Sequence, residues 1–285
     1  MSIADKIKKA VTGGEWFVAY RCELGDYRLA KAPDNQWCAD PFVYGADGKH
    51  YIFVEQYENK KEKGCIGYFQ FENGIPINKG IIIENNYHMS YPDVFDFNGK
   101  YYMIPESSAN STVDLYIADH FPDKWRKTKS LICGYKYVDS TVYQKGNQYY
   151  MISYTMIGGY EVHVFALDME KQRVDLISKK RYEKNIARPA GRLFLEDGIL
   201  KRPAQDCSRK YGESIIIYQV DDFNRNGEYI EHEIGRINTN MMFIDGKPER
   251  VHQLTKDGKY ECIDVYKEKI DLMHLPKVFL RSKRK

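Results

Sequence analysis

Three segments of the chain share one order of apolar and polar positions. Each opens with a short strand pattern that contains an aspartate, in residues 40–43, 91–94 and 139–142. A turn glycine comes next, followed by a run rich in aromatic and β-branched residues, which favours a second strand. A fourth segment at residues 188–194 has the same spacing, although its first strand is basic. A unit of about 50 residues that recurs in this way is typical of the blades of a β-propeller.

The pattern predicts an all-β chain folded as one five-bladed β-propeller, which we place at residues 15–267. Residues 1–14 are expected to form a short helix or arm, and residues 268–285 a basic tail. The strand pattern at residues 16–20 is expected to pair with the last blade, because closing the ring removes an exposed edge. The fifth blade itself is expected within residues 214–237, where the pattern is less regular.

Composition agrees with an all-β chain and limits the classes of molecule that it is expected to bind. Tyrosine occurs 24 times among the 285 residues, and it suits a half-buried pleated surface. The 43 basic and 40 acidic residues nearly balance, so we expect no nucleic acid partner. The six cysteines show neither a CxxC pair nor a Cys/His spacing that binds metal. We therefore expect no metal and no cofactor.

The sequence shows neither the pattern of a secretory signal nor that of a membrane-spanning helix. Its N-terminal residues lack the apolar core of a secretory signal, and no apolar run is long enough to span a bilayer. We therefore expect a cytoplasmic protein. The basic residues at 281–285 are expected to make at most a weak contact with an anionic membrane surface.

Alignment of the first strands on their shared valine brings acidic side chains to one face. Asp40 and Asp139 occupy the same position, and Asp93 lies two residues further along its strand. A shift of two residues keeps a side chain on the same face. All three carboxylates are therefore expected to point into one central space, and they are candidate catalytic residues.

Polar residues end the second strand of each unit, seven residues after the turn glycine. They are Glu55, Glu106, Ser153 and Gln205, and we expect them at the mouth of the same space. Glu106 lies between an apolar strand and two serine hydroxyls. This position makes it a candidate general acid.

A basic cluster accompanies the fourth unit. It contains Arg188, Arg192, Arg202, Arg209 and Lys210. Guanidinium groups bind phosphate or carboxylate through paired hydrogen bonds, so the cluster can form an anion site. It can equally form ion pairs that neutralise the central carboxylates, and the sequence leaves both interpretations open.

Six motifs in one order resemble a known domain. They are residues 37–43, 87–94, 104–108, 139–141, 188–191, and 202–208 with 211–212. Together they resemble the N-terminal domain of the plant glucosamine inositolphosphorylceramide transferases, which also occurs in bacterial proteins. That domain is related to the five-bladed propeller of glycoside hydrolase family 43. The resemblance covers roughly residues 15–265.

The resemblance implies a sugar-binding site at the propeller axis. Asp40 resembles the general base of family 43, and Asp139 or Asp93 resembles the aspartate that tunes a pKa and orients the substrate. The general acid of that family comes from a later blade, where this chain offers arginine and glutamine instead. Glu106 would have to replace it. This departure weakens simple hydrolysis and leaves room for glycosyl transfer.

Several polar and aromatic side chains complete the expected site. His88 is a candidate for bonding a sugar hydroxyl, and Trp37 for stacking on a pyranose ring. The other substrate-binding candidates are Tyr91, Ser107, Ser140, Arg188, Arg192, Arg202, Gln205, Asp206, Arg209 and Tyr211.

Three functions are consistent with these residues. The first is a glycosyltransferase of surface polysaccharide or glycolipid biosynthesis, with an activated sugar-phosphate donor and a carbohydrate or lipid-linked glycan acceptor. Asp40 would deprotonate the acceptor, and the arginines would hold the departing phosphate. The second is a glycosidase with Asp40 as base and Glu106 as acid. The third is a glycan-binding domain without chemistry.

Overall fold

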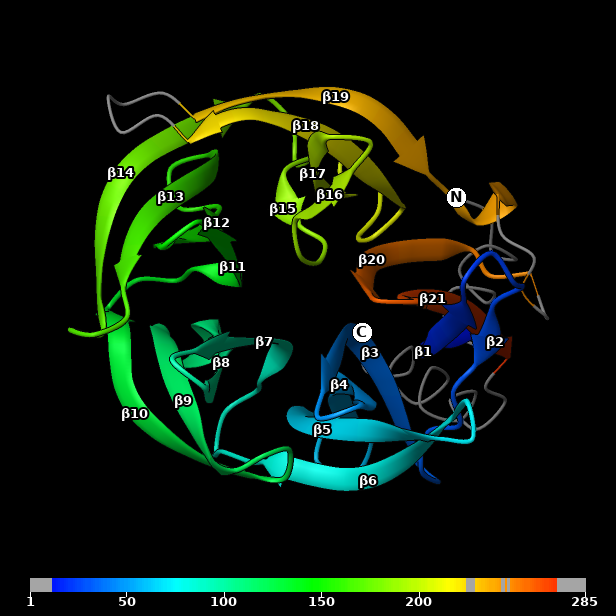
Figure 1. Cartoon of the computed structure of the whole chain (residues 1–285). Coiled ribbons are helices and arrows are strands. Elements are labelled where there is room, and N and C mark those ends of the chain that lie inside the picture. The colour runs from blue at the N-terminus through cyan, green and yellow to red at the C-terminus, as the bar shows by residue number, and fades with distance from the viewer. Residues whose placement is uncertain (1–11, 224–228, 242–243, 245–246, 271–285) are drawn as a thin grey trace, which may run out of the picture.

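Five sheets surround one axis in the computed structural model of the chain. The structure describes residues 12–223, 229–241, 244 and 247–270. Within these residues it contains 21 strands and two single-turn 3-10 helices, η1 (Ser108–Asn110) and η2 (Thr239–Met241). Figure 1 looks along the axis, with the innermost strands facing the centre and β6, β10, β14 and β19 curving around the outside. The prediction of an all-β, five-bladed propeller is confirmed.

The first three blades are each formed by four consecutive strands. Blade 1 contains β3 (Gln36–Ala46), β4 (Lys49–Glu58), β5 (Lys63–Glu72) and β6 (Ile75–Ile83). Blade 2 contains β7 (Ser90–Phe97), β8 (Lys100–Ser107), β9 (Thr112–His120) and β10 (Lys124–Cys133). Blade 3 contains β11 (Val138–Lys145), β12 (Gln148–Thr155), β13 (Tyr160–Asp168) and β14 (Arg173–Tyr182).

The last two blades differ from this scheme. In blade 4 two short inner strands pair with the same neighbour. Its strands are β15 (Arg188–Pro189), β16 (Phe194–Glu196), β17 (Ile199–Asp206), β18 (Ser214–Phe223) and β19 (Tyr229–Ile237). Blade 5 combines both ends of the chain, in the order β20 (Arg250–Asp257), β21 (Tyr260–Ile270), β1 (Thr12–Cys22) and β2 (Arg28–Leu29).

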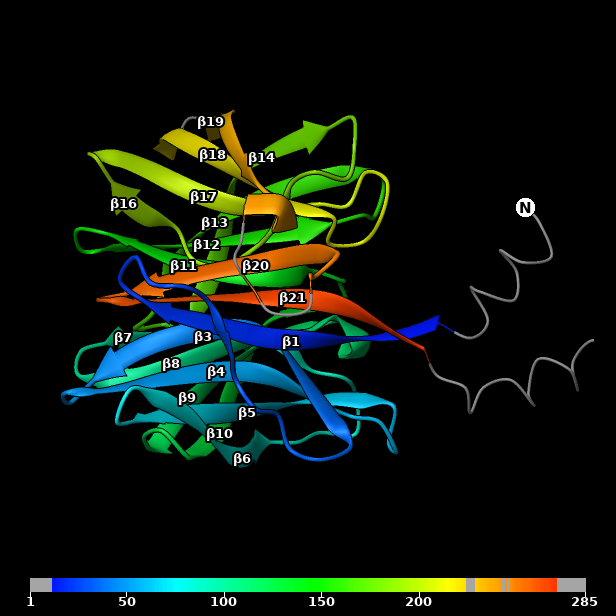
Figure 2. The same cartoon turned by 90° about the vertical axis from the view of Figure 1, so that its right-hand side faces the viewer.

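The ring closes through the N-terminal strand. β1 pairs antiparallel with β21 over its whole length, from Thr12 opposite Ile270 to Cys22 opposite Tyr260. Figure 2 shows these two strands side by side. On its other side β1 pairs with β2 at Ala19 and Tyr20, so this part of its outer edge is covered.

The predicted position of the fifth blade in the sequence was wrong. Residues 214–237 form β18 and β19, which complete blade 4. The fifth blade is formed by β20 and β21, which lie further along the chain, and by the N-terminal strands β1 and β2. The expected arm at residues 1–14 and tail at residues 268–285 overlap the propeller, because residues 12–14 belong to β1 and residues 268–270 to β21. Residues 1–11 and 271–285 lie outside the described residues. Among the residues that are described, no helix is long and apolar enough to cross a membrane.

Apolar side chains fill the spaces between neighbouring blades. In β4 the run from Tyr51 to Val54 is buried without alternation, because blades pack against both faces of the sheet. One core cluster joins blade 1 to blade 2 through Phe53 and Met103, and another joins blade 2 to blade 3 through Leu115 and Phe165. This packing holds the inner strands, and the side chains that they carry, in fixed positions.

Candidate active site

The innermost strands of blades 1, 2 and 3 share one irregularity. Each has a β-bulge, at Asp40, Tyr91 and Asp139 respectively. These three residues have φ values of 49°, 48° and 51°, in the left-handed region that favours glycine. Bulges re-aim side chains, and non-glycine residues in this conformation are concentrated at functional sites. All three residues bond to residues of other blades.

Asp40 is held between blades 1, 2 and 5. Its backbone N–H donates to Oδ2 of Asp264 at 2.9 Å, and its own Oδ2 accepts the N–H of Tyr91 at 3.1 Å. Its Oδ1 lies 3.2 Å from Nε2 of His252, and Nδ1 of the same ring lies 2.7 Å from Oδ1 of Asp264. The imidazole therefore bridges two buried carboxylates.

This arrangement sets the charge of both partners. Burial would raise the pKa of Asp40, but the hydrogen bond and the charge of His252, with help from Arg188, lower it below its ordinary value. Burial would likewise lower the pKa of His252, but the charge of Asp264 and the hydrogen bonds to both carboxylates raise it to about 10. Asp40 is thus kept ionised next to an imidazolium at neutral pH.

Arg188 gathers carboxylates from blades 2 and 3. Its Nε and Nη2 donate to the two oxygens of Asp139, the Nη2 bond being 3.1 Å, and Nη2 also donates to Oε2 of Glu106 at 3.3 Å. Gln205 adds a bond from Nε2 to Oδ2 of Asp139 at 2.9 Å. The side chains of Arg188 and Glu106 are 16% and 10% exposed, whereas that of Asp139 is 1% exposed. A ligand therefore reaches Glu106 and Arg188 before it reaches Asp139.

Glu55 is a further carboxyl group beside these. It lies within β4, three residues before that strand ends at Glu58, and its side chain is 8% exposed. Burial, followed by the negative charge of Asp40, raises its pKa well above the ordinary value. We call Asp40, Glu55, Glu106, Asp139, Arg188 and His252 the axial cluster. It combines an ionised carboxylate with a carboxyl group that retains its proton, which is the combination needed for acid–base chemistry.

Aromatic side chains flank the axial cluster. Trp16 stacks on His252 with ring centres 4.0 Å apart, and the ring of Tyr211 lies 5.3 Å from the Arg188 guanidinium carbon. Tyr211 is 43% exposed, so it stands at the solvent side of the cluster. Trp37 stacks on Tyr57 at 4.4 Å.

The side chain of Tyr91 connects three blades. Its hydroxyl accepts the N–H of Gly191 at 2.8 Å and lies 2.7 Å from Oγ1 of Thr141. Its side chain is fully buried. Tyr91 therefore ties blade 2 to blades 3 and 4, and its hydroxyl has no accessible surface to offer a sugar.

Asp93 and Arg192 were expected at the site, and the structure places them elsewhere. Asp93 is fully buried, accepts the N–H of Val142 at 2.7 Å and bonds Nε of Arg192 at 2.7 Å. Arg192 donates its other N–H groups to the carbonyls of Val43 and Val94. The hydrogen bonds of both side chains fasten four blades together, so neither Asp93, predicted as a catalytic residue, nor Arg192, predicted as a substrate ligand, belongs to the carboxylate group around Asp40 and Arg188.

Three more expected ligands are used inside the blades. Arg202 is fully buried and forms a two-pronged ion pair with Glu231, at 2.6 and 2.7 Å. Ser107 donates to the carbonyl of Thr112, and Ser140 shares a hydrogen bond with Ser153. None of the three hydroxyl or guanidinium groups faces the axial cluster, so these assignments are corrected.

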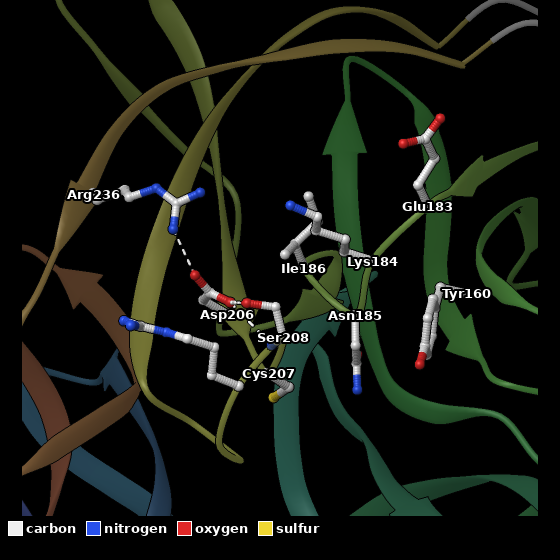
Figure 3. Close-up of a pocket in the computed structure, with 10 residues that line it drawn as sticks. Tyr160, Glu183, Lys184, Asn185, Ile186, Asp206, Cys207, Ser208 and Arg236 are labelled. Atoms are coloured by element: carbon white, nitrogen blue, oxygen red, sulfur yellow. Dashed lines mark hydrogen bonds and ion pairs between the residues drawn. The ribbon is translucent and has the colours of Figure 1, made fainter.

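Asp206 and Arg209 line a separate cleft of about 630 Å³ between blades 3 and 4. Figure 3 shows Asp206 bonded to both Arg236 and Ser208, with Lys184 and Asn185 on the opposite wall. The cleft adjoins the axial cluster, because Cys207 in its wall contacts Oε1 of Gln205, and Gln205 bonds Asp139. The remaining lining residues are Tyr160, Glu183 and Ile186.

Two groups within the described residues bring together atoms that can bind metals. In Asp40, His252 and Asp264 the potential ligand atoms lie within 4.8 Å of one another, but both imidazole nitrogens are already hydrogen-bonded to the carboxylates. In the other group, Glu58 and Glu84 are paired with Lys61. Neither set has the free donor atoms of a built metal site.

Sequence reasoning missed His252, Asp264 and Trp16. All three belong to blade 5, which the sequence pattern did not locate. Their spacing carries no motif, since one comes from the N-terminal strand and the other two from the last two strands. A search for a polar residue at the bulge position of the last inner strand would have found His252, which lies next to the register shift in β20.

Comparisons with known proteins agree with this fold. A relative from Arabidopsis thaliana named glucosamine inositolphosphorylceramide transferase 1 is 32% identical over 215 residues, which are 71% of this chain and 28% of the relative. The chain thus spans little more than a quarter of that relative's length.

Solved structures match in fold. The RS223 β-xylosidase has a TM-score of 0.60 at 13% identity, covering 82% of this chain and 92% of that one. A GH43_1 enzyme from Xanthomonas citri has a TM-score of 0.59 at 11% identity, covering 83% and 89%. Residues 26–254 match the family described as glucosamine inositolphosphorylceramide transferase 1, N-terminal. The chain belongs to this family, which confirms the resemblance seen in its motifs.

Proposed function

We propose that the chain is a carbohydrate-active domain that transfers a glycosyl group in the assembly of a glycolipid or surface polysaccharide. The observation that carries this proposal is the state of Asp40. It is a buried carboxylate kept ionised by His252, next to further carboxyl groups at one end of the axis. Such a group is suited to accept a proton from a hydroxyl that attacks a sugar.

Three carboxylates of the axial cluster act on the substrates in this reaction. Asp40 takes the proton of the acceptor hydroxyl as the new glycosidic bond forms. Asp139 is locked by Arg188 and Gln205, and it supports the electrostatic field around the sugar rather than moving a proton. Glu106 is partly exposed and accepts hydrogen bonds from sugar hydroxyls. Fixed carboxylates also stabilise the positive charge that develops on the sugar ring.

The cleft beside the cluster supports transfer over hydrolysis. Transfer needs a place for a second substrate, and the cleft of about 630 Å³ offers one lined by Asp206, Arg209 and Arg236. In this proposal it holds the polar part of a carbohydrate or lipid-linked glycan acceptor. Trp37 of β3 remains a proposed ligand for the sugar, whereas the ring nitrogens of His88, in the loop between β6 and β7, already contact Gly64 and Glu55.

An activated sugar-phosphate donor is a proposal that depends on one residue. Of the arginines expected to hold phosphate, Arg192 and Arg202 are bound inside the fold, and Arg209 pairs with Glu213 in the neighbouring cleft. Arg188 alone belongs to the axial cluster. A donor phosphate would have to share Arg188 with Asp139 and Glu106, which already bind its Nε and Nη2.

The presence of a single arginine, Arg188, in the axial cluster favours glycoside hydrolysis as the second candidate. A glycoside donor needs no phosphate ligand, and ion pairs account for the arginines fully. In that reaction Asp40 activates water instead of an acceptor hydroxyl.

One experiment separates these functions. The protein is incubated with activated sugars and with aryl glycosides, in the presence and absence of glycan acceptors, and both transfer product and free sugar are measured. We expect donor-dependent product that Asp40→Asn abolishes, while Asp96→Asn, on an exposed aspartate of β7, retains it. Full turnover in folded Asp40→Asn removes Asp40 from the role. Glycan binding without any turnover assigns the chain to the non-catalytic alternative.

A further inference from the structure

Three blades place a carboxyl or carboxamide group at one height along the axis. Glu55 pairs with Ala39, Glu106 with Ser90, and Gln205 with Arg188, so the three side chains hold equivalent positions on the second strands. Equivalent positions permit a direct comparison of what each group bonds. The comparison separates Glu55 from the other two.

Each polar atom of the Glu106 carboxylate and of the Gln205 amide has a hydrogen-bond partner within the fold. Oε1 of Glu106 accepts the hydroxyl of Ser108 at 2.6 Å, and Oε2 accepts Arg188. The amide of Gln205 donates to Asp139 and to the carbonyl of Pro189. Within the described residues, neither group has a buried polar atom without a partner.

Glu55 is buried but unsatisfied. The residue is 6% exposed, and within the described part of the chain its buried Oε1 accepts no hydrogen bond. Polar atoms are rarely left in this state unless a ligand or a catalytic role explains them, because an unpaired buried group costs free energy. Glu106, the acid expected from the sequence, differs from Glu55 in this respect.

His88 determines how Glu55 is oriented. Nδ1 of His88 accepts the N–H of Gly64 at 3.0 Å, so in the neutral ring the proton is on Nε2. Nε2 lies 3.3 Å from Oε1 of Glu55. The ring therefore lies beside Oε1 without donating a hydrogen bond to it, so His88 restricts where the carboxyl group can lie and leaves Oε1 without a partner among the described residues.

Gly64 makes the room for this pair. A Cβ at position 64 would lie 2.4 Å from Oε1 of Glu55, 2.7 Å from the Met89 carbonyl and 2.8 Å from Cε1 of His88. The backbone of Gly64 is not in the left-handed region, so the glycine is required here by the close approach of the carboxyl group and not by a turn.

From these contacts we infer that Glu55, not Glu106, is the group that donates a proton to the leaving oxygen of the glycosyl donor, and that His88 positions it. This inference rests on the proposed function and names a further catalytic residue for it.

The step balances between two carboxyl groups. The bond from the anomeric carbon to the leaving oxygen breaks, and that oxygen keeps the electron pair and takes the proton of Glu55. The acceptor hydroxyl forms the new bond to the anomeric carbon and gives its proton to Asp40. Glu55 ends as a carboxylate and Asp40 as an acid, and proton exchange between them restores the starting state.

The surroundings of Glu55 agree with a retained proton. Burial raises the pKa of this carboxyl group first, and the charge of Asp40 raises it further, whereas His252 opposes the shift. Burial also lowers the pKa of His88, which keeps that ring neutral. The titratable groups that act on Glu55 or respond to it are Cys38 and Asp40 of β3, Tyr57 of β4, His88, Glu106 of β8, Tyr211, His252 of β20 and Asp264 of β21.

The first test needs no substrate. Carboxyl carbons of glutamate are labelled with carbon-13, and their chemical shifts are followed from pH 3 to 8 in the wild type and in Glu55→Gln. We expect one resonance to be missing in the variant and to titrate in the wild type well above the ordinary glutamate pKa of about 4.3. A missing resonance that titrates with the other glutamates overturns the inference.

The second test reads the role in turnover. A general acid matters for a poor leaving group and little for a good one, and its loss costs roughly 10²- to 10⁴-fold. We expect Glu55→Gln to lose activity by about this factor on alkyl glycosides and to keep most of it on dinitrophenyl glycosides. Glu55→Asp should partly restore the former. Glu106→Gln should slow both substrates alike.

The outcomes remain distinguishable. If Glu106→Gln shows the selective loss instead, Glu106 is the proton donor and the inference fails while the proposed function stands. If the wild type converts no glycosyl donor, the proposed function fails and with it the donor role, and the titration still reports whether Glu55 keeps its proton.

Discussion

Asp40 and His252 face each other across the joint where the ring closes, with 3.2 Å between Oδ1 and Nε2. They are 212 residues apart, and the two blades that carry them meet because β1 pairs with β21. The same closure brings Trp16 onto the imidazole ring. The charge of the central carboxylate is therefore a product of ring closure, since neither blade could set it alone.

This relationship predicts a fall in stability at alkaline pH. The folded pKa of His252 is raised to about 10 from an ordinary value of 6.5, so its stabilising contribution is complete below pH 6.5 and is lost as the pH rises through 10. Replacement by His252→Gln leaves two buried carboxylates without their cation, which costs about 3–5 kcal/mol at pH 6. The gap from the wild type should narrow toward pH 10.

Urea unfolding followed by circular dichroism at pH 6 and pH 10 measures this gap. His120→Gln is the matched control, because His120 is exposed and pairs only with Asp123 in the described structure. It should change the unfolding free energy by less than about 0.5 kcal/mol at either pH. A His252→Gln variant with a pH-independent deficit would show that the imidazole is neutral in the folded protein.

The buried pair of Arg202 and Glu231 predicts a purely structural phenotype. Both side chains are at most 1% exposed, so Arg202→Met leaves an uncompensated buried carboxylate and should cost about 3–5 kcal/mol. The double variant Arg202→Met/Glu231→Leu should recover most of that loss. Thermal or urea unfolding measures both.

Arg209→Met provides the comparison, because Arg209 is 81% exposed on its side chain and its ion pair with Glu213 lies at the surface. Its unfolding free energy should stay within about 0.5 kcal/mol of the wild type. Loss of glycan binding in Arg202→Met without loss of stability would instead restore Arg202 as a ligand.

The fold was largely predictable because each repeat is marked by a local sequence pattern of two strands joined by a tight turn. Turns such as Asp47–Gly48 and Asn98–Gly99, with positive φ at both residues, join the first two strands of their blades. Blade 5 could not be assigned in the same way, because its strands come from both ends of the chain.

Small offsets account for the errors at the site. Two residues displace a side chain by about 6–7 Å along a strand, and Asp93 bonds Val142 and Arg192 instead of joining the axial cluster. Ser153 fell one position off the true register because Gly146 is the first residue of its turn, whereas Gly48 is the second of its own. Tyr154 holds the position that corresponds to Glu55.

Gly64→Ala tests the close approach of Glu55 and His88. The added methyl group would lie 2.4 Å from Oε1 of Glu55 and 2.7 Å from a backbone carbonyl, so the carboxyl group has to move and the backbone has to yield. Overpacking of this kind costs about 1–3 kcal/mol in well-packed cores, and we expect a loss of unfolding free energy of about 2 kcal/mol here. Turnover should fall with it.

Gly235→Ala is the control for this substitution, since a Cβ at that position of β19 meets no atom within 4 Å. We expect it to leave turnover unchanged and to alter the unfolding free energy by less than about 1 kcal/mol. Equal behaviour of the two variants in unfolding and in turnover would show that the carboxyl group does not depend on the space at Gly64.

Tyr91→Phe distinguishes a structural hydroxyl from a ligand hydroxyl. The variant keeps the ring in the axis but removes the oxygen that accepts the N–H of Gly191, and a buried N–H left without an acceptor costs about 1–3 kcal/mol. Glycan affinity should remain that of the wild type, because the hydroxyl is sealed from solvent. Tyr149→Phe, which loses an exposed bond to the carbonyl of Asp96, should change stability by less than about 0.5 kcal/mol. Urea unfolding and calorimetric glycan titration of the same samples distinguish the two roles. Weaker glycan binding at unchanged stability would show that Tyr91 is a substrate ligand. Lower stability at unchanged glycan affinity would show that its hydroxyl has a structural role.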